Sequence, residues 1–142
     1  MTTVRRVLGA KPPNVWTIDP DATVFEAIAK MAEKDVGSMV VMEGGRLLGL
    51  ITERHYARNV ALKGKTSPAI PVKDIMERHV IYVRPEQTVE ECMALMTEKR
   101  VRHLPVIESG KVIGIVSIGD LVKSVIADQQ FVIEQLEHYV HG

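Results

Sequence analysis

The chain repeats itself at a fixed offset of 65 positions, and this repeat limits the possible folds more than any other feature. The match runs without a gap from residues 15–56 to residues 80–121. Each half is too short to bury a large core alone, so we expect two similar halves that pack together. Matching pairs include Pro20 and Pro85, Thr23 and Thr88, Met31 and Met96, Gly45 and Gly110, and Gly49 and Gly114.

Each half has the pattern of a strand, a helix, two strands and a second helix. Residues 15–18 form a short apolar strand before Pro20. Thr23 with Glu26, and Thr88 with Glu91, have the spacing of a helix capping box. Dense apolar runs at 39–42 and 104–107, each followed by a turn and a second run, predict paired strands. The second helices are expected to begin near Glu53 and Ile118. The fold class is therefore α/β (α+β), a tandem β-α-β-β-α repeat.

The repeat also predicts the domain boundaries. We expect an N-terminal helical segment at 1–14, a first domain at 15–62 and a second domain at 73–126. Residues 63–72 form a linker rich in Gly, Ser, Thr and Pro, and residues 127–142 form a C-terminal helical extension. The apolar stripe from Val125 to Val140 is broader than one small domain needs. It packs on a partner subunit or covers the core of its own domain.

Composition excludes several classes of protein. Lys plus Arg and Asp plus Glu number 18 each, whereas duplex nucleic-acid binders usually carry a basic excess. The chain has one cysteine, Cys92, so an intrachain disulfide cannot form. It shows no apolar run typical of a signal peptide or membrane span, which favours a cytoplasmic protein. Neither a nucleophile elbow, a phosphate-binding Gly-Lys-Thr loop nor a metal-ligand cluster is evident, so we expect no catalytic residues and no metal.

The stretch from Gly114 to Asp120 is the most informative for function. A strand ends there and a helix begins with a hydroxyl, Ser117, and then a carboxylate, Asp120. One interpretation is a helix cap. The other is a ligand site, because a helix N-terminus attracts phosphate, a carboxylate can bind both hydroxyls of a ribose, and Gly119 permits close approach to the backbone.

Together these features resemble the cystathionine-β-synthase-type (CBS) domain, and the tandem copy resembles the two-domain Bateman module. The resemblance rests on the doubled element pattern, the Gly-x-x-Ser-x-x-Asp motif at 114–120 and the Arg-His-Leu-Pro-Val run at 102–106. It implies two domains packed with pseudo-twofold symmetry around clefts that bind an adenine nucleotide. By the resemblance, Ser117 contacts phosphate, Asp120 holds the ribose, and Arg102 and His103 reach phosphates.

The first repeat departs from this pattern. Thr52 matches the phosphate-contacting position, but His55 stands where the family has Asp. Neutral imidazole offers one acceptor, so two-point ribose binding is lost. The first site is empty, weaker or adapted to another ligand, and Arg54 and His55 could instead meet phosphate. Positions 37 and 38, which match Arg102 and His103, hold Gly37 and Ser38.

Two further segments line the adenine pocket by the resemblance, namely the strand residues Trp16 and Thr17 and their counterparts Ile81 and Tyr82. Trp16 either stacks on a base or packs in the core. A stand-alone, non-catalytic regulatory module that binds AMP is the leading hypothesis, with NAD, ADP, ATP and S-adenosylmethionine also possible. We expect a homodimer that signals to a separate effector protein. The alternative is an interaction or scaffold protein whose ligand site is vestigial.

Overall fold

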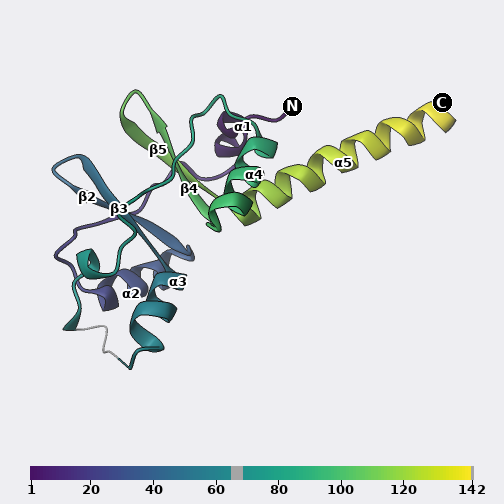
Figure 1. Cartoon of the computed structure of the whole chain (residues 1–142). Helices are drawn as coiled ribbons and strands as arrows, with labels where there is room; N and C mark the ends of the chain where they lie inside the picture. Colours follow the sequence, from purple (N-terminus) through teal and green to yellow (C-terminus); the bar gives the residue numbers. More distant parts are fainter. Residues whose placement is uncertain (65–68, 142) are drawn as a thin grey trace. The chain divides into compact units, whose positions relative to one another are not determined.

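The computed structural model describes residues 1–64 and 69–141, so residues 65–68 of the predicted linker lie outside the described residues. The chain forms two compact units (Figure 1). The first-repeat unit is Asn14–Ile81, and the second-repeat unit combines Met1–Pro13 with Tyr82–Gly142. Both units mix helices with strands, which confirms the predicted α/β class.

The first-repeat unit contains the expected strand, helix, strand, strand and helix. Its sheet has the order β1-β2-β3, with β1 parallel to β2 and β2 antiparallel to β3. The first strand is shorter than the predicted residues 15–18, because only two residues pair with β2. The elements are β1 (Thr17–Ile18), α2 (Val24–Lys34), β2 (Ser38–Glu43), β3 (Arg46–Thr52), α3 (Glu53–Tyr56), the π-helical turn η1 (Ala57–Ala61) and the 3₁₀ turn η3 (Val72–Asp74).

The core of this unit lies between α2 and the sheet. The apolar stripe of α2 supplies Ala27 and Met31, and alternate residues of β2 supply Met39 and Val41. Removing such side chains from water stabilises the unit by about 1.5–3 kcal/mol for each large residue. Val72 and Met76, which precede the second repeat in sequence, complete the same core.

The second-repeat unit has the same plan with one strand fewer. Its sheet contains only β4 and β5, which are antiparallel. The predicted strand at Ile81 and Tyr82 is absent, since the ladder there is a single parallel bridge between Val83 and Val106. The elements are α1 (Val4–Gly9), α4 (Val89–Lys99), β4 (His103–Glu108), β5 (Lys111–Ser117) and α5 (Ile118–His141).

The segment that precedes each repeat packs in the other unit. The N-terminal segment belongs to the second-repeat unit, where Val4 N donates to Gln87 O at 2.8 Å and Val89 N donates to Thr2 O at 3.0 Å. In the first-repeat unit, Val24 N donates to Ile70 O at 2.8 Å. Helix α1 therefore does not stand apart as a separate domain.

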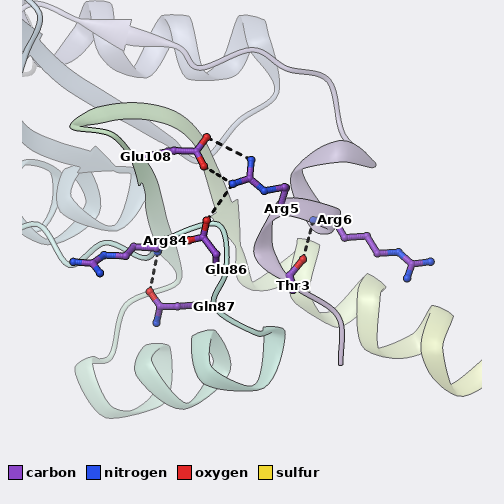
Figure 2. A network of polar contacts seen from close by, with 7 residues as sticks. All are labelled: Thr3, Arg5, Arg6, Arg84, Glu86, Gln87 and Glu108. Carbon is purple, nitrogen blue, oxygen red and sulfur yellow. Dashed lines mark hydrogen bonds and ion pairs between the residues drawn. The ribbon is translucent and has the colours of Figure 1, made fainter.

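An exposed polar network holds α1 against the second-repeat unit. Figure 2 shows the Arg5 guanidinium contacting Glu108 at the end of β4 and Glu86 before α4. Beside it, Thr3 caps α1 by accepting from Arg6 N at 3.4 Å. Ion pairs that are this exposed to water contribute little to the stability of a fold. The buried side chains of Val4 and Val7 therefore contribute most of the packing of α1.

Helix α5 is a single helix of 24 residues, so the second helix of the repeat and the predicted C-terminal extension are continuous. Figure 1 shows it continuing well past α4 and α1. Among its described side chains, which end at His138, only those in the first turns are covered, with Leu121 fully buried. The helix also carries exposed apolar side chains, which include Val122, Ile126, Phe131, Val132, Ile133 and Leu136.

Candidate functional site

The junction between β5 and α5 forms a reciprocal helix cap. Asp120 N donates to Ser117 Oγ at 3.2 Å, and Ser117 N donates to Asp120 Oδ2 at 2.9 Å. The predicted cap is therefore present. It also fixes a hydroxyl and a carboxylate side by side at the start of a long helix, where the helix dipole favours an anion.

Two basic residues lie next to this cap. His103 opens β4 and is the register partner of Ser117 on β5, so their side chains share a face of the ladder. Arg102 O accepts a hydrogen bond from Ile118 N at 2.9 Å, which places Arg102 beside the start of α5. The sheet therefore brings together four residues predicted for one site: Arg102, His103, Ser117 and Asp120.

A fifth residue at this site, the basic Lys11, was not predicted. Its Nζ donates to Asp120 Oδ2 at 2.7 Å and to Ile115 O at 2.8 Å. Burial of the Asp120 carboxyl acts to raise its pKa, but the hydrogen bonds from Lys11 and Ser117 outweigh burial and hold that pKa below its usual value. Asp120 is thus an anion with a lysine counter-ion at neutral pH.

The backbone at the start of α5 is exposed, so a ligand could approach it closely. Gly119 is exposed, and a Cβ built there would meet only Ser117 Oγ, at 3.6 Å, an ordinary contact. Packing within the unit therefore does not require glycine at this position. Tyr82 belongs to the same unit and is 47% exposed.

The first-repeat unit has a matching cap with different chemistry. Thr52 N donates to His55 Nδ1 at 3.1 Å, and His55 N donates to Thr52 Oγ1 at 3.3 Å. Imidazole thus takes the structural place of the Asp120 carboxylate. Burial lowers the pKa of His55 and the charges of Arg54 and Arg58 add to this effect, while Glu77 opposes it. His55 is therefore neutral at pH 7, and its one acceptor is used by the cap.

The other predicted residues of this unit occupy varied surroundings. Ser38 is buried and pairs with Thr52 across β2 and β3, as His103 pairs with Ser117. Trp16 packs against the core, and Lys34 Nζ lies 4.6 Å from the centroid of its ring. This supports the core interpretation of Trp16. Thr17 is exposed on β1, Arg54 lies in α3, and Ile81 ends the unit.

Metal-ligand clusters and membrane-spanning helices are both absent from the described part of the chain. No group of three or more His, Cys, Asp or Glu side chains among these residues could hold a metal ion. No described helix has both the length and the apolar character needed to cross a bilayer.

Comparison with known proteins identifies the repeat. The profile of the CBS domain matches residues 4–61 and again residues 72–127, which together make up most of the chain. This chain belongs to the CBS-domain family. The resemblance drawn from the doubled pattern and the Gly-x-x-Ser-x-x-Asp motif is confirmed.

Several CBS-domain proteins are similar over nearly the whole chain. A solved CBS-domain protein from Burkholderia ambifaria MC40-6, described as a signal-transduction protein, is 52% identical, with a TM-score of 0.87 over 90% of this chain and 96% of that one. The mitochondrial CBS domain-containing protein CBSX3 of Arabidopsis thaliana is 38% identical and covers 99% of this chain and 73% of its own. The cytoplasmic location therefore stays a prediction.

A more distant solved structure shares the fold. The CBS domain pair of protein MJ0100, solved in complex with 5′-methylthioadenosine and S-adenosyl-L-methionine, is 24% identical. It covers 90% of this chain and 98% of that chain, with a TM-score of 0.78.

Proposed function

We propose that this CBS-domain pair is a non-catalytic regulatory module that binds an adenine nucleotide, with AMP favoured over NAD, ADP or ATP. In this proposal Ser117 contacts the phosphate and Asp120 holds the ribose hydroxyls. Arg102 supplies positive charge, His103 offers an imidazole hydrogen-bond partner for the phosphate, and Tyr82 lines the adenine site. Binding of the nucleotide passes a signal to a separate effector protein.

One observation carries the proposal: a hydroxyl and a carboxylate meet at a helix N-terminus whose backbone is exposed at Gly119, with His103 opposite Ser117 on the neighbouring strand and the Arg102 carbonyl bonded to the first helical residue. Glycine costs a helix about 1 kcal/mol relative to alanine. Nothing in the unit's own packing needs that glycine, so close approach by a ligand is a physical reason for its presence. The adenosyl ligands of the structurally similar MJ0100 support the adenosine part of this choice, although neither of them carries a phosphate.

Gly119→Ala is the sharpest test, because the added methyl group leaves the protein's own contacts intact. We expect the variant to be at least as stable as the wild type and to bind AMP about tenfold more weakly, a loss of about 1.4 kcal/mol. Calorimetric titration measures the affinity. Gly9→Ala is the matched control, since Gly9 ends α1 and a Cβ there meets nothing within 4 Å. Equal AMP affinity in Gly119→Ala and the wild type would contradict the proposed site.

We propose a weaker or different site in the first-repeat unit. His55 offers its only acceptor to Thr52, so no ribose-binding carboxylate stands there. We therefore expect one strong AMP site for each chain. Replacing His55 by Asp restores the residue type of the second repeat, and titration of that variant is expected to show a second site.

We also propose that the chain forms a homodimer through α5. Along this helix Ile118, Val122, Val125, Gln129, Val132 and Leu136 follow at alternating spacings of four and three, the spacing of a coiled-coil seam. Val122 and Leu136 each lie seven positions from Gln129. In an antiparallel pair centred on Gln129, Val122 of one copy therefore meets Leu136 of the other.

The oligomeric state tests this pairing. Light scattering after gel filtration is expected to show a dimer for the wild type and a monomer for Leu136→Lys, because a lysine at the seam lacks a partner for its charge. Leu62→Lys is the control, since Leu62 is 81% exposed and lies in the first-repeat unit. A monomeric wild type, or a dimeric Leu136→Lys variant, would rule the seam out.

A further inference from the structure

Lys11 forms the most buried of the ion pairs found among the described residues. Its side chain is 32% exposed and that of Asp120 is 19% exposed, whereas each of the other pairs includes a carboxylate that is at least 37% exposed. Lys11 lies just beyond α1, 109 positions from Asp120 in sequence. The N-terminal segment thus places the Lys11 ammonium in direct contact with Asp120, the proposed ribose-binding carboxylate.

The contacts of Asp120 show where a ligand would meet this cation. Oδ2 accepts from both Lys11 Nζ, at 2.7 Å, and Ser117 N, at 2.9 Å. The Lys11 ammonium and the Ser117 backbone N–H therefore donate to the same carboxylate oxygen. Because Oδ2 already accepts these two hydrogen bonds, a ribose that binds the carboxylate through both of its hydroxyls competes with Lys11 for Oδ2. In this inference, the displaced ammonium turns to a phosphate held by the Ser117 hydroxyl.

We infer that Lys11 makes the second-repeat site select phosphorylated adenosine over the uncharged nucleoside. This inference rests on the proposed function and concerns the same site. An uncharged nucleoside that displaces Lys11 from Asp120 leaves a half-buried ammonium without its counter-ion, which is costly. A phosphorylated ligand displaces the same contact but gives the ammonium a new anion, and charge-assisted hydrogen bonds to phosphate are strong.

The selectivity has a simple signature. Removing the charge of Lys11 takes a favourable partner away from the phosphate and also frees Asp120 for the ribose. The loss of the phosphate partner lowers the ratio of AMP affinity to adenosine affinity. The freeing of Asp120 raises both affinities by the same factor, because both ligands carry the ribose, and leaves the ratio unchanged. A lysine that only fastened the N-terminal segment to β5 would instead change both affinities by the same factor.

Calorimetric titration of AMP and of adenosine into the wild type and Lys11→Met measures this ratio. We expect the ratio to fall about tenfold in Lys11→Met, and to stay near the wild-type value in Lys11→Arg, which keeps the charge. Lys73→Met is the matched control, because Lys73 also forms a lysine–aspartate pair, with Asp21 at 2.9 Å, but in the first-repeat unit. If Lys11→Met folds poorly, Lys11→Gln removes the charge and keeps a polar group, with the same expected fall.

The outcomes separate this inference from the proposed function. An unchanged ratio in the uncharged variants, with AMP still bound, overturns the role of Lys11 and leaves the nucleotide site standing. If the wild type binds neither AMP nor adenosine, the role of Lys11 and the proposed nucleotide site are both overturned. A fall of the ratio that also appears in Lys73→Met would assign the effect to general surface charge and overturn the inference.

Discussion

Replacing Gly49 by alanine tests how the segment before the second repeat is locked onto β3. A Cβ at Gly49 would lie 2.7 Å from Glu77 O and 2.7 Å from Met76 Sδ. The Glu77 backbone cannot move away easily, because Leu50 N donates to Glu77 O at 3.0 Å and Glu77 N donates to Leu50 O at 2.8 Å. Overpacking of this kind costs about 1–3 kcal/mol. Alanine recovers about 0.5–1 kcal/mol of the conformational cost of glycine in a strand.

The matching position in the second repeat provides a comparison. A Cβ at Gly114 would lie 2.6 Å from Leu8 Cδ2, which is the end of a flexible side chain rather than backbone. Rotation of Leu8 can relieve most of this clash. We therefore expect Gly49→Ala to lower the free energy of unfolding by about 1–2 kcal/mol and Gly114→Ala to lower it by less, on the scale of overpacked sites.

Urea unfolding followed by tryptophan fluorescence is the appropriate assay. The chain has one tryptophan, Trp16, and it lies in the same unit as Gly49. Far-ultraviolet circular dichroism on the same samples follows both units, so a transition confined to one unit is visible as a difference between the probes. A Gly49→Ala midpoint at or above that of the wild type would refute the reasoning, and so would a larger loss in Gly114→Ala.

Two other predictions concern titratable groups. The cap in the first-repeat unit needs neutral His55, and burial lowers the pKa of His55 from its ordinary value of 6.5. The stabilisation is therefore fully present above pH 6.5 and is lost as the pH falls through the lower folded-state pKa. Urea midpoints measured by Trp16 fluorescence from pH 7.5 to pH 5 are expected to fall in the wild type and to fall less in His55→Gln. Burial, aided by Glu91, raises the pKa of the Cys92 thiol to about 11. A thiol reagent at pH 8 is expected to modify Cys92 only as fast as the unit opens, and rapid modification of the native protein would contradict this packing.

Much of each unit could be predicted from the sequence because its signals are local. The caps at Thr88 and at Ser117 depend on residues three positions apart, and the structure contains both. The apolar stripe of α2 and the dense runs at β2 and β4 follow the periods of helix and strand. The offset of 65 positions then showed that the same plan occurs twice, which identified the family.

Features that depend on long-range contacts were decided by tertiary structure. The sequence does not show that Val83 pairs through a single bridge where a strand was expected. It also does not show that each leading segment packs in the other unit, since those segments lie outside the matched repeat. Lys11 meets Asp120 across 109 positions, and a side-chain ion pair at that separation leaves no periodic trace. The sequence alone thus determined the doubled fold and the chemical groups at the helix start, because these depend on neighbours along the chain. Only the folded chain decided which distant charge lies beside those groups.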